Sequence, residues 1–296
     1  MHPPRRPFPA RDAIDAALVG ALLREQMPAW AELPVVAIAF PGNDHRTFRV
    51  GDGLIARLPA DLDYVPQVTK EQAILPRLAP SLPLPIPTVA GVGRASALFP
   101  APWSVYEWID GERPDAERVR DDVILAEDLG SFLFALQRID TAGGPTPGQH
   151  SAFRGDPVSQ WDEQVSRRLA LLDPSARDRA VGLWRDALAA EFCGPPVWVH
   201  GDVAIANLLV DDQLVLSAVI DFGCAAVGDP ACDTVIHWTQ FRGAARRAFR
   251  RVLDVDDATW ARGAGWTLWK GLIMLTNNTP GERAFAARVL EEVLAP

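Results

Sequence analysis

The sequence has no apolar run long enough to cross a membrane and no excess of basic residues. A membrane-spanning helix needs about 20 consecutive apolar residues. Lys and Arg total 29 against 38 Asp and Glu, which gives a formal net charge of −9, whereas binding nucleic-acid phosphates requires a basic surface. We therefore expect neither a membrane nor a nucleic-acid partner. The acidic balance is compatible with a cationic small molecule.

Cysteine is also scarce. The three cysteines, Cys193, Cys224 and Cys232, are odd in number and lack the paired spacing of a metal site, which predicts free thiols in a reducing compartment. No apolar stretch follows the basic residues of segment 1–7, so no secretory signal is predicted and a cytoplasmic location is expected. The 296 residues, 48% of them hydrophobic, suffice for two unequal lobes.

The most informative pattern is His200-Gly201-Asp202, followed by Asn207 and then Asp221-Phe222-Gly223. The Asp-x-x-x-x-Asn spacing is the one by which a kinase catalytic loop places a base and a magnesium ligand. Carboxylate and amide oxygens are hard ligands that suit Mg²⁺. The pattern predicts Asp202 as the catalytic base, and Asn207 and Asp221 as the metal ligands of a phosphoryl-transfer site.

Short apolar runs flank this loop at 197–199, 207–210 and 215–220 and read as strands. Asp211-Asp212-Gln213 is a turn candidate between the last two. The predicted order is therefore strand, catalytic loop, hairpin and metal-binding aspartate.

With these motifs the chain resembles the aminoglycoside phosphotransferase and choline kinase-like family of small-molecule kinases. The resemblance rests on the segments 200–202 and Gly228-Asp229-Pro230-Ala231-Cys232-Asp233. Gly201 replaces the arginine of protein kinases and no Ala-Pro-Glu follows Asp221, which disfavours a regulated protein kinase. The resemblance implies an α+β, protein-kinase-like fold of two lobes. Residues 1–108 would form a small antiparallel-sheet lobe that binds nucleotide, and residues 109–296 a larger, mainly helical lobe for catalysis and substrate binding.

The nucleotide lobe would begin with a strand at 35–40 and a turn at 42–47 that lies over the phosphates. His45 and Thr47 are its candidate nucleotide contacts, although an ordinary polar hairpin turn explains them equally well.

The next predicted strand, 54–58, places Arg57 where the family usually has a phosphate-binding lysine. Arginine keeps the cation and adds a bidentate fork. It would pair with the phosphates and with Glu71, for which Lys70 is a rival partner; an exposed arginine at a strand end is the alternative. The helix carrying Glu71 is expected to stop at Pro76, and the proline-rich stretch 80–87 to be extended.

The backbone of Glu107, Trp108 and Ile109 falls at the family's hinge, where extended backbone pairs with the purine of ATP or GTP. Trp108 is otherwise expected to be a core aromatic residue.

Beyond the hinge, helices are predicted from about 121 to 136, at 161–172, at 177–192 and at 234–241. Segment 143–164 lies where the family builds its variable substrate-binding insertion. Its acidic residues Asp156, Asp162 and Glu163 could face a cationic ligand, but solvated surface carboxylates are favoured. The resemblance implies that Asp233 caps the helix at 234–241 or anchors the catalytic loop. Asp229, which precedes Pro230, is expected nearer the acceptor side, where it could shape the site or bind substrate.

The sequence thus predicts an enzyme that moves the terminal phosphate of ATP or GTP to a hydroxyl of a small molecule. The family's best-known substrates make inactivation of an aminoglycoside or macrolide antibiotic the leading hypothesis. A metabolic kinase for an amino alcohol, sugar or similar compound is the alternative. A non-catalytic nucleotide-binding regulator stays open because Arg57 replaces the usual lysine.

Overall fold

The computed structural model describes residues 8–38, 44–277 and 279–295. Its contacts divide the chain into two compact units. Unit 1 comprises Met1–Pro80, Pro85–Asp110 and Ile220–Gly223, and unit 2 comprises Ser81–Leu84, Gly111–Val219 and Cys224–Pro296. The division of roles between residues 1–108 and 109–296 stays a prediction.

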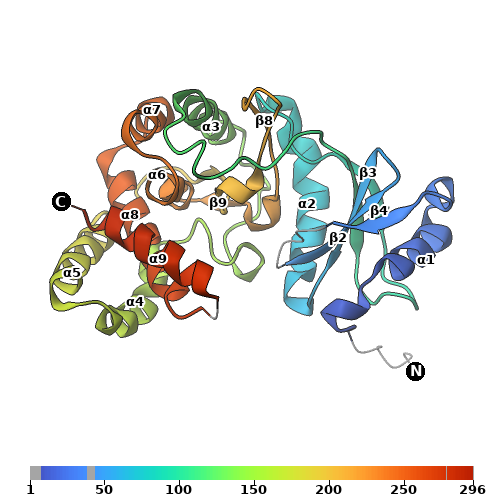
Figure 1. Cartoon of the computed structure of the whole chain (residues 1–296), viewed down its shortest axis with the longest axis horizontal. Coiled ribbons are helices and arrows are strands. Elements are labelled where there is room, and N and C mark those ends of the chain that lie inside the picture. The colour runs from blue at the N-terminus through green and yellow to red at the C-terminus, as the bar shows by residue number, and fades with distance from the viewer. Residues whose placement is uncertain (1–7, 39–43, 278, 296) are drawn as a thin grey trace. The chain divides into compact units, whose positions relative to one another are not determined.

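Unit 1 is built on a five-stranded antiparallel sheet, with α1 and α2 as its helices (Figure 1). Apolar side chains of α1 and of the strands share one buried core. The elements are α1 (Ala16–Gln26), β1 (Val35–Ala37), β2 (His45–Val50), β3 (Leu54–Pro59), α2 (Val65–Leu78), β4 (Val89–Gly93) and β5 (Trp103–Glu107), and the strand order is β1-β2-β3-β5-β4. The sheet agrees with the predicted α+β class.

Two local predictions in unit 1 are wrong. The turn expected at 42–47 is instead strand from His45 onward, because His45 pairs with Pro59 and Thr47 with Arg57 in the β2–β3 ladder. The first part of that turn and the end of the strand expected at 35–40 lie outside the described residues. Pairing with β3 therefore holds His45 and Thr47 in the sheet.

The helix expected to stop at Pro76 continues through it, since α2 runs from Val65 to Leu78. A proline this close to the end of a helix removes one backbone hydrogen bond. The side chains of Ile74, Leu75 and Leu78 are buried on either side of it. Burial of this apolar face outweighs the lost hydrogen bond.

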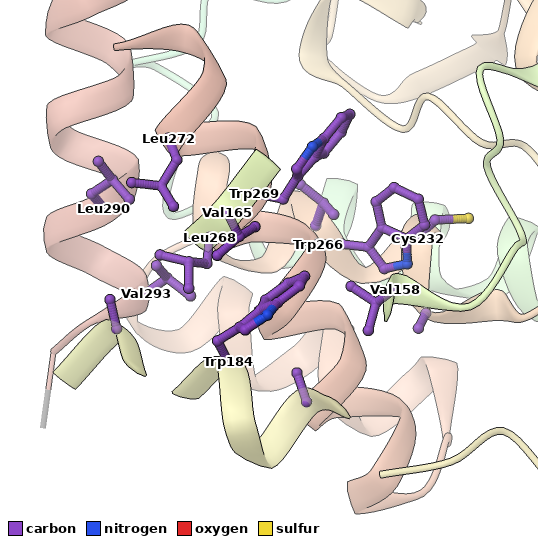
Figure 2. Packing of buried hydrophobic residues seen from close by; sticks show 14 of the residues in the cluster. Val158, Val165, Trp184, Cys232, Trp266, Leu268, Trp269, Leu272, Leu290 and Val293 are labelled. Atoms are coloured by element: carbon purple, nitrogen blue, oxygen red, sulfur yellow. The ribbon is translucent and has the colours of Figure 1, made fainter. Parts of the chain in front are cut away.

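Unit 2 is mainly helical and carries two short antiparallel ladders, β6–β9 and β7–β8. Helices α3 and α7 pack side by side (Figure 1). Indole rings of Trp184, Trp266 and Trp269 lie among aliphatic side chains of α8 and α9 in the core (Figure 2). The elements are α3 (Val123–Leu136), α4 (Asp162–Arg168), α5 (Pro174–Ala189), β6 (Val197–Val199), β7 (Leu208–Val210), β8 (Leu216–Val219), β9 (Ala226–Gly228), α6 (Ile236–Thr239), α7 (Gly243–Leu253), α8 (Asp257–Met274) and α9 (Pro280–Val293).

The predicted helix at 121–136 is confirmed as α3, whose first turn is capped by the side chain of Asp122 accepting from the Leu125 N–H at 3.0 Å. The predicted helix at 161–172 is broken into α4 with a 3-10 turn at each end. The one at 234–241 is reduced to the four residues of α6, preceded by the last two residues of the 3-10 helix η10 (Pro230–Val235). Short 3-10 segments leave little periodic signal in a sequence.

All three cysteines are free thiols, as predicted. No helix in the described ranges has both the length and the apolar character needed to cross a membrane.

A buried histidine predicts how stability depends on pH. His237 lies on α6 with its ring 4.6 Å from that of Trp238 and 4.8 Å from that of Trp260. Burial, reinforced by Arg246 and Arg250, lowers the pKa of His237 from 6.5 to about 3. Between these values the unfolded chain binds the proton and the folded chain does not. The contribution of the neutral His237 side chain to the free energy of unfolding is therefore complete above pH 6.5. It is lost as the pH falls from 6.5 towards 3, by about 1.4 kcal/mol per pH unit.

The check is urea unfolding of the wild type and His237→Phe at pH 7.5 and pH 5.5. Phenylalanine fits an aromatic cluster and does not titrate. We expect the variant to lose about 1.4 kcal/mol less than the wild type over this interval. His45, whose pKa is also lowered to about 3, keeps part of the dependence in both proteins. Equal losses would show that His237 is protonated in the folded state.

Candidate functional site

The catalytic-loop motif follows β6 and is anchored by Asp233. The backbone N–H groups of His200 and Gly201 each donate to one carboxylate oxygen of Asp233, both at 2.7 Å. Burial raises the pKa of Asp233, while His200 and the two N–H donors oppose that rise. Asp233 thus anchors the loop and lies within η10. The cap of η10 is Asp229, which accepts from the Ala231 N–H at 3.0 Å.

Gly201 adopts a conformation that disfavours any other residue. Its φ is +81°, and a Cβ atom built there would lie 2.4 Å from the carbonyl oxygen of Cys224. The arginine of the protein-kinase motif could not occupy this backbone. The histidine-glycine-aspartate form of the loop follows from its packing against residue 224.

Asp202 and Asn207 are joined in one polar network. The Asn207 side-chain nitrogen donates to the Asp202 carbonyl oxygen at 2.9 Å and to the Asp202 carboxylate at 3.2 Å. Holding the nitrogen in this way fixes the amide so that its oxygen remains as a separate acceptor. The Asp202 side chain is 42% exposed. One side chain thus offers an accessible carboxylate and the other an oriented amide oxygen.

A pocket of unit 2 lies beside Asp202. It is lined by Arg154, Trp266, Trp269 and Lys270, with Cys232 and the loop residues completing its wall. The two tryptophans and the lysine come from α8, where Trp269 and Lys270 follow Trp266 by three and four residues, so they share one side of the helix. Figure 2 shows the two tryptophans. Sequence reasoning missed this face. The available signal was Trp-x-x-Trp-Lys at helical spacing, with Lys270 one of only two lysines in the chain.

The acidic residues of segment 143–164 do not line this pocket. Asp162 accepts from the Trp184 indole nitrogen at 2.7 Å, and Glu163 forms an exposed ion pair with Arg167. Asp162 and Glu163 are exposed, as the favoured interpretation of surface carboxylates predicted. The segment contributes the cation Arg154 to the pocket instead.

Asp229 makes structural contacts, and its expected place near the acceptor side stays a prediction. Asp229 is buried, and its two oxygens accept from Arg262 Nε at 2.6 Å and Nη2 at 3.0 Å. A carboxylate committed to a buried bidentate pair has a structural role.

In unit 1, Arg57 gathers the other predicted site residues. Its Nη1 lies 3.5 Å from Glu71 Oε1, and its Nη2 lies 3.1 Å from Asp221 Oδ1 and 3.4 Å from His45 Nδ1. The hydroxyl of Tyr106 donates to the other oxygen of Glu71 at 3.2 Å. Lys70, the rival partner, donates to the Gly223 carbonyl oxygen at 2.6 Å.

The charged groups around Arg57 shift one another's pKa values. Burial alone would lower the pKa of Arg57, but Asp221 and Glu71 raise it overall, so the guanidinium stays charged. Burial raises the pKa of Glu71 against the opposing effect of Arg57. Burial and Arg57 lower the pKa of His45 to about 3, which keeps the imidazole neutral at physiological pH. Its Nε2 is buried and makes no hydrogen bond within the described part of the chain.

The hinge candidate follows β5. The Glu107 N–H donates to the Thr88 carbonyl and the Trp108 N–H to the Gly53 carbonyl, at 2.9 and 2.8 Å. Trp108 is not the core residue expected, because it is only half-buried and the Arg49 guanidinium lies 3.5 Å from its ring centroid. Of the three predicted hinge amides, that of Ile109 makes no backbone hydrogen bond among the described residues.

The predicted residues therefore form two sets. Asp202 and Asn207 belong to unit 2, and Arg57, Glu71, His45 and Asp221 to unit 1. The hairpin β7–β8 pairs Leu208 with Val219, so Asn207 precedes one of its strands and Asp221 follows the other at the same end of the hairpin.

The fold is that of known kinases for small molecules. Aminoglycoside 2'-phosphotransferase-IIIa, solved as a GDP complex, superimposes with a TM-score of 0.74 at 20% identity over 95% of this chain and 98% of that chain. Macrolide 2'-phosphotransferase MphH from Brachybacterium faecium gives 0.62 at 24% identity, over 93% and 97%. The gentamicin complex of APH(2")-IIa gives 0.61 at 19%, over 96% and 97%. A search of curated proteins gives no match.

These likenesses define a protein-kinase-like fold of the antibiotic phosphotransferase type. Residues 36–266 match the phosphotransferase enzyme family (APH), and the chain belongs to that family. It is a nucleotide-dependent small-molecule kinase, as the sequence predicted.

Proposed function

We propose that this protein transfers the terminal phosphate of ATP or GTP to a hydroxyl of a small molecule, with Asp202 accepting the hydroxyl proton. The observation that carries the proposal is the network in which the Asn207 amide is held by Asp202. It places an exposed carboxylate next to an oriented amide oxygen, the pair of groups that phosphoryl transfer requires from a catalytic loop.

Asn207 and Asp221 are the proposed ligands of Mg²⁺. The donor set fits a hard cation, since it offers one amide oxygen and one carboxylate, the latter on a side chain that is 36% exposed. Magnesium, when bound, neutralises charge on the transferring phosphates. The residues of the chain supply the rest, because Asn207 is kept in orientation by Asp202 and Asp221 is held by Arg57.

Nucleotide binding is assigned to unit 1. Arg57 offers a charged fork in place of a lysine, and Glu71 keeps that fork in position. The N–H of Ile109 is the hinge donor for the purine, and His45 and Thr47 on β2 are further candidates for nucleotide contacts.

Two acceptor classes follow. Aminoglycosides and macrolides come first, because the similar structures are described as phosphotransferases for these antibiotics. A metabolic hydroxyl compound comes second, and the two cations in the pocket beside Asp202 favour an anionic compound of this class over an amino alcohol. The non-catalytic regulator is the weakest alternative because Asp202, Asn207 and Asp221 are all present.

The test is phosphate transfer from magnesium-ATP and magnesium-GTP across aminoglycosides, macrolides, amino alcohols, sugars and hydroxy acids, with an Asp202 variant as control. Transfer that requires Asp202 supports the proposal. Nucleotide binding with no transfer to any acceptor, and no slow hydrolysis above that of the control, would instead indicate the regulator.

Replacing Asp221 by asparagine should weaken binding of the metal–nucleotide complex about tenfold or more, because a neutral amide replaces the charged ligand. The measurement is nucleotide affinity by calorimetry at several magnesium concentrations. Binding without magnesium should change little. A variant with unaltered magnesium dependence would remove Asp221 from the metal site. Asp212→Asn, a change of an exposed carboxylate in the β7–β8 turn, is the matched control.

A further inference from the structure

The pocket beside Asp202 holds more positive charge than its own residues neutralise. Lys270 forms a long ion pair with Asp202, in which Nζ is 3.9 Å from Oδ1 and therefore beyond hydrogen-bond distance. Arg154 Nη1 is buried and has no hydrogen-bond partner in the described ranges. Among the described residues that line the pocket, Asp202 is the only one with a carboxylate. Two cationic groups thus share one carboxylate, and the Arg154 Nη1 donor is left unused.

Arg154 is held rigidly, so its unused donor has a fixed direction. Its Nε donates to the Gly201 carbonyl oxygen at 3.0 Å. Its guanidinium carbon lies 4.6 Å from the Trp269 ring centroid and 5.1 Å from that of Trp266. Stacking of this kind orients the planar fork. A buried donor without a partner costs free energy unless a ligand satisfies it.

The ammonium group of Lys270 is confined beside Asp202. The side chain is 22% exposed, and it starts from the same face of α8 as the two tryptophans. Burial and Arg154 lower the pKa of Lys270, and Asp202 raises it. A second anion placed between Lys270 and Arg154 would stabilise both charges.

We propose that the acceptor is a hydroxy acid, whose anionic carboxylate binds Lys270 and Arg154 while its hydroxyl faces Asp202. The indoles of Trp266 and Trp269 hold the Arg154 guanidinium in place for this contact. A polycationic amino sugar would meet two like charges in this pocket, which disfavours it. The inference rests on the proposed kinase function and narrows its substrate class.

The first experiment does not depend on turnover. The chain has only two lysines, so acetylation of Lys270 by an N-hydroxysuccinimide ester can be followed on a single peptide by mass spectrometry. Gluconate and 3-phenyllactate should slow that acetylation about threefold or more at millimolar concentration, whereas gluconamide, 3-phenyllactamide and kanamycin should not. Equal protection by acid and amide, protection by kanamycin alone, or protection by none would overturn the proposal.

The second experiment measures selectivity in phosphate transfer. In the wild type, kcat/KM for a hydroxy acid should exceed that for its amide, and Lys270→Gln should reduce this ratio about tenfold or more. Lys270→Arg keeps the charge and should retain most of the ratio. An equal loss of kcat for acid and amide would show that Lys270 acts on the transferring phosphate, which contradicts an acceptor site. Absence of any transfer, including slow hydrolysis of ATP, would contradict the kinase function itself, and the acetylation result would stand apart from it.

Discussion

Asp202→Asn should lower kcat about a thousandfold, within the 10²–10⁴ range of a general base. Asparagine has nearly the same shape and can still accept the hydrogen bond that Asn207 donates at 3.2 Å. It cannot accept a proton from the substrate hydroxyl. The loop should therefore keep its geometry while losing its base, and nucleotide affinity should change little.

Single-turnover transfer to the best acceptor, together with nucleotide binding by calorimetry, checks this expectation. Asp212→Asn is again the control, because it removes one negative charge from an exposed turn of the same unit. Wild-type rates are expected for it. A rate for Asp202→Asn within tenfold of the wild type would eliminate Asp202 as the base. A parallel loss of nucleotide binding would point to a disturbed fold.

The motif residues could be predicted from the sequence because their chemistry depends on short spacings. Asp202 and Asn207 are five positions apart, and the network between them is local. Asp221 follows a hairpin whose two strands were visible as apolar runs. The antiparallel sheet was an implication of the family resemblance, and the strands at 35–40 and 54–58 were placed in it from their apolar residues.

The pocket could not be predicted in the same way. Lys270 and Arg154 meet Asp202 only through tertiary packing, across 68 and 48 positions of sequence, and neither belongs to a motif. The predicted end of α2 at Pro76 was wrong for a related reason. The hydrogen bond that the proline removes is local, whereas the compensating burial of Leu75 and Leu78 depends on tertiary packing. The buried pairing of Asp229 could not be predicted either, because nothing adjacent in the sequence indicates its partner Arg262.

That partnership gives the largest expected effect on stability. The Asp229–Arg262 pair is buried on both sides, with side chains 2% and 4% exposed. Asp229→Ala would leave Arg262 as an uncompensated buried charge and would also remove the cap of η10. We expect the free energy of unfolding to fall by about 3–5 kcal/mol. Removing Glu163 from its exposed pair with Arg167 should cost less than about 1 kcal/mol.

Urea unfolding of the two variants tests this difference. The double variant Asp229→Ala, Arg262→Met should recover part of the loss, because it removes the unpaired charge and keeps an extended side chain of similar length. The same experiment separates the two interpretations of Asp229. A substrate contact would raise KM and leave stability unchanged. The structural role predicts a loss of stability as the primary effect. Activity would be affected only through the fold, because η10 contains Asp233, and Asp233 holds the loop that positions Asp202. Loss of stability should therefore come first, and any loss of activity should follow from it.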